Sequence, residues 1–454
     1  SALGAATLGA ATLGAATLGA AAYSASGEPA APRRPNVVII VSDDHGFGDF
    51  GCYGNPVLKT PHLDQLHDES VRLARFYVSP VCAPTRAGLM TGRYPYRSGV
   101  VDTYVGRALM DPHEVTLADC LRRAGYATGI FGKWHLGDSY PLRPVDRGFD
   151  DSLVLKGGGL MQPSDPRVTS YFDPILWHNG EEVQTTGYCT DVITDAAIAF
   201  TRAHQTQPFL TVITTNAPHV PLEVDEKYAA PYRAQGVPED DARFYGMVAN
   251  LDENVGRYLG ELDRLGLRED TLVIFFTDNG AQYNRSGPRF SAGQRDQKGS
   301  VYEGGIHVPC FMRWPRALRG GVDRRDLAAV IDMFPTILAA CGAALPEGLR
   351  LDGINLLDTL RDGAPLPARS YFTQWHRGDV PEASKNAAVV TQQYKLVNGK
   401  ELYDLEHDPD EAHDLASEHP DIVARLRAEY EAWFKDVCAT RSGCSEARSW
   451  ASSG

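Results

Sequence analysis

Four largely apolar runs along the chain share one pattern, because each is followed at once by polar residues. The runs occupy residues 36–41, 126–131, 209–214 and 271–276. A continuous apolar run, unlike a strict alternation of apolar and polar positions, is typical of a strand buried on both faces. We therefore expect the four runs to be interior strands of one sheet.

The segments between these runs predict helices. Residues 116–125 have apolar positions at helical spacing and stop at Gly125, and residues 244–265 form a longer amphipathic pattern. Strands that alternate with helices indicate an α/β fold with a large, mainly parallel sheet flanked by helices. In such sheets ligands bind beyond the carboxyl ends of the strands, so the polar residues after the four runs should describe one site.

The last quarter of the chain has a different pattern, rich in turn residues and short apolar segments. Its strand candidates and closing elements are residues 370–373, 387–390 and 394–397, a turn over 401–409 and a helix over 422–437. We predict a large α/β domain over residues 35–365 and a small antiparallel subdomain with a helix over residues 366–454.

Residues 1–34 stand apart, because the pentad Leu-Gly-Ala-Ala-Thr recurs from Leu3, Leu8 and Leu13. This low-complexity, mildly apolar segment resembles the apolar region of an export signal without its basic start, and a linker is the alternative. We expect export to the periplasm or the cell exterior. No later segment has the length and apolarity of a membrane span.

The charge and cysteine content limit the partners of this 454-residue chain. Its formal net charge of −14 argues against nucleic acid and anionic membranes, so an anionic ligand needs a local basic pocket. None of the eight cysteines lies in a Cys-x-x-Cys pair, which disfavours zinc. Cys438 and Cys444 are close enough in sequence to form a disulfide in an oxidising compartment.

Two pairs of oxygen-bearing side chains follow the first and the fourth apolar runs. These are Asp43 with Asp44 and Asp278 with Asn279. Either pair alone is explained by ordinary turn chemistry. Two pairs at strand ends that adjoin predict a metal site, and ligation by oxygen alone selects calcium or magnesium over zinc.

A cysteine lies at the start of the helix-permissive stretch from Cys82 to Arg93. The unpaired backbone N–H groups of a helix N-terminus favour a negative charge there. Arg86 follows about one turn later, where its planar fork could bind an anion. The alternative is a structural cysteine buried on a helix.

Basic and imidazole side chains follow the second and third runs and precede a later glycine-rich stretch. Lys133 and His135 lie in Gly-Lys-Trp-His, His219 lies in Ala-Pro-His-Val-Pro, and Lys298 precedes Gly-Ser-Val-Tyr-Glu-Gly-Gly. Each could be an exposed loop residue. Lys133, His135 and His219 follow strand ends and would instead face the expected site. Lys298 follows no such run, and its place in the site rests on the family resemblance given below.

The stretch Cys82-Ala83-Pro84-Thr85-Arg86, with Thr91-Gly92-Arg93, resembles the signature of the formylglycine-dependent, arylsulfatase-like sulfatases of the alkaline phosphatase superfamily. The resemblance extends from about Pro35 to Val437. It implies an alkaline-phosphatase-like fold with a smaller C-terminal subdomain. It also implies that a maturation enzyme oxidises Cys82 to formylglycine, whose hydrate is the nucleophile.

The resemblance also implies a role for each polar residue. Asp43, Asp44, Asp278 and Asn279 would bind Ca²⁺ in preference to Mg²⁺. Arg86 would hold the oxidised side chain, and Lys133 would bind a sulfate oxygen. His135 would hydrogen-bond the aldehyde hydrate, and His219 would face the leaving-group oxygen as an acid or donor. Lys298 would bridge the sulfate and the leaving-group oxygen.

The resemblance implies a sulfated carbohydrate as the substrate, with small aryl sulfates accepted. His376 and Arg377 are candidate sugar contacts, although they could equally be exposed loop residues. A phosphatase or phosphonate monoester hydrolase of the same superfamily would use a similar site. A sulfoglycan-binding protein without catalysis is the alternative if Cys82 is not oxidised.

Overall fold

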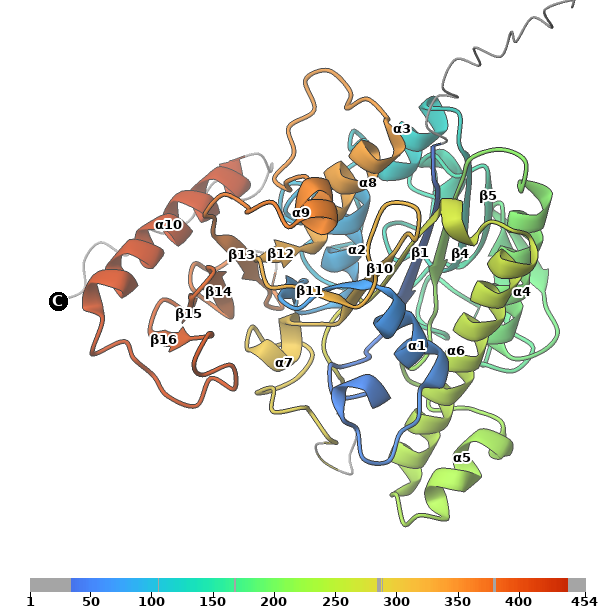
Figure 1. Cartoon of the computed structure of the whole chain (residues 1–454), viewed down its shortest axis with the longest axis horizontal. Helices are drawn as coiled ribbons and strands as arrows, with labels where there is room; N and C mark the ends of the chain where they lie inside the picture. Colours follow the sequence, from blue (N-terminus) through green and yellow to red (C-terminus); the bar gives the residue numbers. More distant parts are fainter. Residues whose placement is uncertain are drawn as a thin grey trace, which may run out of the picture. The chain divides into compact units, whose positions relative to one another are not determined.

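A ten-stranded sheet is the largest element of the computed structural model (Figure 1). The structure describes residues 34–439 except 105, 167–168, 284–286, 288 and 379–380. The expected export segment, apart from Arg34, and Cys444 of the expected disulfide lie outside the described residues.

Five strands at the centre of the sheet are parallel, in the order β9-β1-β8-β4-β5. Four of them are the apolar runs of the sequence, and every residue in these four is buried. The expectation of a mainly parallel sheet is therefore confirmed. The five strands are β1 (Asn36–Ser42), β4 (Ala127–Lys133), β5 (Asp151–Leu155), β8 (Phe209–Thr214) and β9 (Thr271–Thr277).

Shorter strands extend the sheet at both edges. Strand β10 (Cys310–Arg313) pairs antiparallel with β9 and is followed by β2 (Val71–Leu73) and β11 (Val322–Arg324). At the other edge, β6 (Ile175–His178) and β7 (Glu181–Gln184) form a hairpin beside β5. None of these strands exceeds four residues, and such short segments carry little periodic signal in the sequence. The two-residue strands β3 (Phe76–Tyr77) and β12 (Ala328–Ala329) pair separately.

Helices cover both faces of the sheet (Figure 1). Alternate residues of β1 belong to two different hydrophobic clusters, one on each face. Val37, Ile39 and Val41 belong to one hydrophobic cluster, which includes residues of α2 (Cys82–Thr91), α3 (Leu117–Arg123) and α8 (Met333–Cys341). Val38 and Ile40 belong to a second cluster, with α1 (Pro61–Glu69), α4 (Cys189–Ala203) and α6 (Glu239–Arg264). The remaining helices before the C-terminal region are α5 (Glu226–Arg233), α7 (Glu303–Ile306) and α9 (Leu357–Asp362).

The ends of the two helices expected from the sequence follow ordinary capping chemistry. Helix α3 begins at a capping box in which the Thr116 and Asp119 side chains each bond to the other's backbone N–H. Helix α6 begins five residues before the expected start, at Glu239, with an acidic first turn that complements the helix dipole.

The C-terminal region is a four-stranded antiparallel sheet with a closing helix. It contains β13 (Tyr371–Gln374), β14 (Ala387–Val390), β15 (Tyr394–Val397), β16 (Glu401–Asp404) and α10 (Pro420–Ala439). Its apolar residues belong to the same cluster as one face of β1. The stretch 401–409, expected as a turn, begins instead with β16, because Leu402 and Tyr403 are buried against the sheet.

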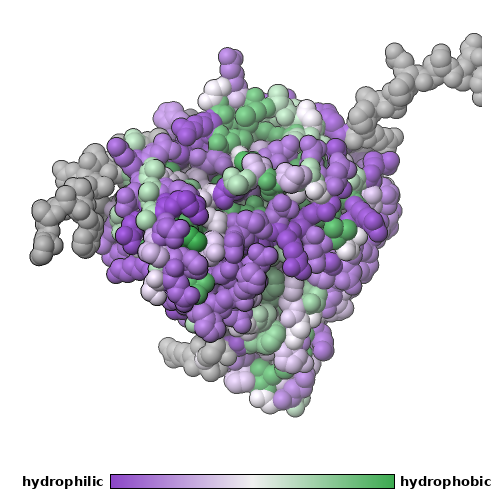
Figure 2. Space-filling model, turned by 60° about the vertical axis from the view of Figure 1, so that its left-hand side comes forward, coloured by the Kyte–Doolittle hydropathy of each residue, from purple (hydrophilic) through white to green (hydrophobic). Residues whose placement is uncertain are grey.

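The face of the molecule in Figure 2 is mainly hydrophilic, with smaller areas of apolar residues. Within the described residues, none of the helices combines the length and apolarity that crossing a bilayer requires.

Candidate active site

The carboxyl ends of β1 and β9 bring the two acidic pairs together, because these neighbouring strands end in register. Asp43 and Asp44 follow one strand, and Asp278 and Asn279 follow the other. The Asn279 amide donates to Asp44 Oδ1 from 2.8 Å, and all four side chains belong to residues at most 1% exposed. Asp44 has a φ of 61°, a left-handed conformation that is uncommon outside glycine and recurs at functional sites.

Each of the three carboxylates has a cationic partner. Lys133 and Arg86 are almost completely buried, and Lys298 is largely buried. The pairs are Lys133 Nζ with Asp43 Oδ2 at 2.5 Å, Lys298 Nζ with Asp44 Oδ1 at 2.5 Å, and Arg86 Nη2 with Asp278 Oδ2 at 2.7 Å. The charges of the three carboxylates are therefore balanced within the protein, in a chain that is acidic overall.

Three side-chain oxygens of the two pairs after β1 and β9 are buried and accept no hydrogen bond. They are Asp43 Oδ1, Asp44 Oδ2 and Asn279 Oδ1. Buried polar atoms are normally satisfied, and unpaired oxygens that converge are the ligands of a hard cation. Burial raises the pKa of Asp43 well above its usual range, the Asp278 carboxylate adds to this, and a divalent cation would offset both. The residues therefore fit a calcium or magnesium ion.

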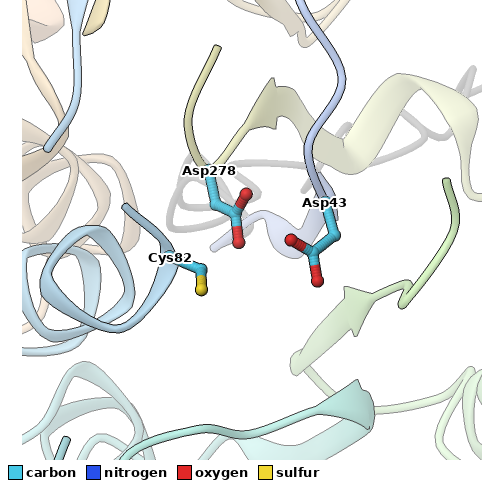
Figure 3. Close-up of side chains that lie close together, drawn as sticks. All are labelled: Asp43, Cys82 and Asp278. Carbon is cyan, nitrogen blue, oxygen red and sulfur yellow. The ribbon is translucent and has the colours of Figure 1, made fainter. Parts of the chain in front are cut away.

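Cys82 is the first residue of α2, and its side chain lies beside Asp43 and Asp278 (Figure 3). Ligand atoms of Cys82, Asp43 and Asp278 lie within 4.8 Å of one another. No side chain caps the N-terminus of α2, so its first N–H groups remain available to a negative charge on residue 82. The whole helix is buried, which fixes the direction of the Cys82 side chain.

Arg86 connects the Asp278 carboxylate to strand β4. Its Nε and Nη2 atoms donate to Asp278 Oδ2 from 3.1 and 2.7 Å, and Nη1 donates to the Lys133 carbonyl oxygen from 2.7 Å. The guanidinium fork thus fixes the position of one carboxylate relative to the backbone that carries Lys133.

His135 has one ring nitrogen bound to backbone and one free to act. Its Nε2 lies 2.6 Å from the Thr103 carbonyl oxygen, which only a protonated nitrogen can approach, and its Nδ1 is buried without a partner. Burial, with the Lys133 ammonium, holds the pKa of His135 well below its ordinary value. The ring is therefore neutral, with a lone pair on Nδ1.

His219 has the opposite arrangement of nitrogens. Its Nδ1 donates to the Val220 carbonyl oxygen from 2.6 Å, and its Nε2 lies 3.7 Å from Asp44 Oδ2. Burial lowers the pKa of His219 to about 4, while the Asp44 carboxylate opposes this shift. A bound anion at Nε2 would raise the pKa and favour the protonated ring.

A glycine triplet, separated from the end of β5 by Lys156 alone, lets the chain pass close to both histidines, and it was not predicted from the sequence. A Cβ atom on Gly158 would lie 2.6 Å from His135 Cε1, and one on Gly159 would lie 3.0 Å from His219 Cε1. Gly157 Cβ would meet the Asp165 carboxylate. Three successive glycines at the carboxyl end of a strand were the available signal.

A cavity of about 390 Å³ opens over these residues. Cys82, His135, His219 and Lys298 line one part of it. The other described lining residues include amides, aromatic rings and one guanidinium, and none is acidic: Gln162, Gln282, Tyr283, Gln297, Trp375 and Arg377. Cations, imidazoles and amides without a carboxylate form a lining suited to an anionic, hydroxyl-rich ligand.

The two residues expected to contact a sugar occupy different positions. Arg377 lines the cavity and is 58% exposed in its side chain. His376 is half-buried and is not among the described residues that line the cavity, so its contact with substrate stays a prediction.

Comparison with known proteins adds independent information. Residues 35–343 match the family model described as Sulfatase, and residues 295–435 match the model described as N-sulphoglucosamine sulphohydrolase, C-terminal. The chain is 32% identical to the steryl-sulfatase of Mus musculus over 444 residues, covering 77% of this chain and 70% of that one. It is 32% identical to the N-acetylgalactosamine-6-sulfatase of Homo sapiens over 385 residues, covering 78% of this chain and 70% of that one. The crystal structure of Ps i-CgsB with k-i-k-neocarrahexaose superposes with a TM-score of 0.81 and 28% identity, covering 92% of this chain and 96% of that one.

Proposed function

The chain belongs to the sulfatase family of the alkaline phosphatase superfamily, and we propose that it hydrolyses sulfated carbohydrates by means of a calcium ion and a formylglycine made from Cys82. The observation that carries this proposal is the convergence of Cys82 with Asp43 and Asp278, beside three unpaired oxygens. A thiol kept only for packing would have no need to face two carboxylates from the helix N-terminus.

The proposed chemistry assigns a proton-transfer role to each imidazole. A hydrated aldehyde at position 82 would supply one hydroxyl to attack sulfur and a second whose deprotonation expels sulfate and restores the aldehyde, and calcium would stabilise the negative charge. His135 Nδ1, which has a free lone pair, accepts the proton of the second hydroxyl. With a bound sulfate raising its pKa, the His219 ring is protonated, and its Nε2 gives a proton to the sugar oxygen as the bond between that oxygen and sulfur breaks. Lys133 and Lys298 stabilise the charge that gathers on the sulfate oxygens.

The cavity lining supports a carbohydrate rather than an apolar alcohol. Amide and guanidinium groups border the space beyond the catalytic residues, and the aromatic rings of Tyr283 and Trp375 offer faces to sugar C–H groups. Sugar names also recur among the similar proteins, in N-acetylgalactosamine-6-sulfatase, N-sulphoglucosamine sulphohydrolase and the neocarrahexaose complex. We propose the sugar class on these two grounds together.

The first test combines peptide mass and sulfate release. Protein co-expressed with a formylglycine-generating enzyme should yield a Cys82 peptide with the mass of an aldehyde or its hydrate. The same protein should release sulfate from 4-nitrophenyl sulfate and sulfated sugars, and only weakly hydrolyse 4-nitrophenyl phosphate. A preference for phosphate would favour the phosphatase alternative.

Substitution of Cys82 tests its role as the nucleophile separately from any effect on the stability of the fold. Cys82→Ser should abolish turnover and leave thermal unfolding unchanged, because serine occupies the same buried position at the start of α2. The matched control is Cys52→Ser, in a cysteine away from the cavity lining, which should retain full activity. Full activity of Cys82→Ser would refute the formylglycine mechanism.

We further propose that the protein is exported, on the composition of residues 1–34. A reporter fused to these residues should reach the periplasm or the medium, and a reporter retained in the cytoplasm would refute this.

A further inference from the structure

Arg377 lies at the border of the cavity, held by two aromatic rings and a carboxylate. Its guanidinium carbon is 5.2 Å from the centre of the Tyr104 ring and 5.6 Å from that of Trp375. Its Nη1 is 3.7 Å from Asp102 Oδ2, beyond hydrogen-bond distance. The stacked arginine is thus positioned while its side chain stays more than half exposed.

The Asp102 carboxylate is occupied mainly with organising this wall of the cavity. It is completely buried, and its Oδ1 accepts from Trp375 Nε1 at 2.9 Å and from the Thr103 N–H at 2.7 Å. Its Oδ2 faces a second guanidinium, that of Arg107, at 3.6 Å. Both guanidinium groups lie beyond hydrogen-bond distance of this oxygen, so Arg377, which lines the cavity and is more than half exposed, keeps donors for a ligand there.

Trp375 links this wall to the catalytic end of the cavity. A Cβ atom on Gly299, the residue after Lys298, would lie 3.0 Å from Trp375 Cζ3. The indole therefore forms a continuous surface between Lys298 and Arg377, and both of these cations line the same cavity. A sugar with its sulfate beside Lys298 would extend along the indole toward Arg377.

Building on the proposed sulfatase function, we propose that the substrate carries a second anionic group, a carboxylate or another sulfate, which Arg377 binds. A guanidinium fork can bind two oxygens at once, either of a planar carboxylate or of a tetrahedral sulfate group. The absence of acidic residues from the described cavity lining makes the second anion favourable in spite of the chain's net negative charge. The substrate class is thus a sulfated saccharide with at least two negative charges.

The test compares sulfated sugars that carry one anionic group with related sugars that carry two, by calorimetry on Cys82→Ser protein, so that no maturation is needed. The singly charged probes are N-acetylgalactosamine 6-sulfate and N-acetylglucosamine 6-sulfate. Their doubly charged partners are N-acetylgalactosamine 4,6-disulfate, glucosamine 2-N,6-O-disulfate and a chondroitin 6-sulfate disaccharide, whose second anion is a uronate. We expect at least one doubly charged probe to bind about tenfold more tightly or better than its singly charged partner.

Arg377→Gln should reduce that preference to about threefold or less, and Arg377→Lys should restore part of it. The matched control is Arg361→Gln on α9, an exposed arginine paired with Asp358, which should keep the wild-type preference. Tighter binding of a disulfated sugar, but not of the uronate-containing disaccharide, would identify the second anion as a sulfate. Tighter binding of the uronate-containing disaccharide alone would identify it as a carboxylate. The proposal is overturned if no doubly charged probe is preferred, or if the preference survives in Arg377→Gln.

Failure of this inference is distinguishable from failure of the proposed function. If oxidised wild-type enzyme releases sulfate from 4-nitrophenyl sulfate but shows no charge preference, only the second-anion site is refuted. If it releases no sulfate from any ester, the proposed function fails, while the binding preference and its loss in Arg377→Gln still decide the second-anion site.

Discussion

Lys395 of strand β15 lies 2.8 Å from Glu303 of helix α7, and this buried ion pair joins the C-terminal sheet to the segment that carries Lys298. Lys395 Nζ is also 2.8 Å from Glu411 Oε1, and Glu411 in turn accepts from the Glu303 N–H at 2.7 Å. Because Glu303 begins α7 five residues after Lys298, the C-terminal sheet helps to set the position of a lysine that lines the cavity.

Replacement of Lys395 by methionine should destabilise the protein strongly. It would leave two buried carboxylates, Glu303 and Glu411, without their cation, and breaking such a buried pair costs about 3–5 kcal/mol. Urea unfolding measures the change. The control Lys385→Met removes an exposed pair with Glu382 and should change stability little. Wild-type stability of Lys395→Met would contradict a structural role for the cluster.

The stability deficit of Lys395→Met should depend on pH. Burial by itself would raise the pKa of Glu303, but the Lys395 ammonium, with His307, holds it well below 4.5. Because the pKa of Glu303 is lower in the folded than in the unfolded chain, the ionised carboxylate stabilises the folded wild type above pH 4.5. This stabilisation is lost as the pH falls below 4.5 toward the folded-state pKa. In the variant, burial is uncompensated and favours the neutral carboxyl group. The deficit should therefore be smaller at about pH 5 than at about pH 8; an equal deficit at both would indicate a packing effect.

Arg86→Lys should impair metal binding and activity although it preserves charge. A lysine lacks the planar fork by which Arg86 donates twice to Asp278 and once to the Lys133 carbonyl oxygen from fixed positions. Loss of a group that orients a metal ligand costs roughly 10–100-fold in affinity or activity. Calcium titration and kcat/KM measure this. Arg122→Lys, in an exposed pair with Asp150, should behave as wild type, and unchanged calcium affinity in Arg86→Lys would contradict the assignment.

Removal of the metal should abolish turnover without unfolding the protein. The three site carboxylates already have three cationic partners, so the empty site carries no net repulsion that would open the fold. Dialysis against a chelator should leave the circular dichroism spectrum intact, and added calcium should restore activity. At a hundredfold excess over Kd, calcium should add about 2.7 kcal/mol to stability. Full activity in chelator would refute the metal requirement.

Gly280→Ala should disrupt the site through a backbone clash. A Cβ atom there would lie 1.7 Å from the Gly304 carbonyl oxygen, so the segment after Asn279 and helix α7 would have to separate. A displacement of about 1 Å can lower kcat/KM on the order of a hundredfold. Gly260→Ala, inside α6 with open space around it, should be neutral or stabilise by up to about 1 kcal/mol. Equal activity of the two variants would contradict this account.

Much of the fold could be read from hydrophobic pattern, because burial on both faces leaves a continuous apolar run. The seven residues of β1 are all buried, and the runs at β4, β8 and β9 were visible for the same reason. Strand β10 was not visible, because its four residues are too few to show a period and its partner β9 is more than 30 residues away.

The sequence by itself determined which residue types gather at the site, since parallel strands that end in polar residues place them at one edge of the sheet. Only the tertiary structure decided how they combine: which lysine meets which aspartate, and which backbone carbonyls hold His135 and His219. The contact of Arg377 with Asp102 likewise joins residues 275 positions apart in the chain (377 minus 102). Such contacts depend on strand order and loop packing, which are set by the summed burial of the whole core rather than by any local pattern.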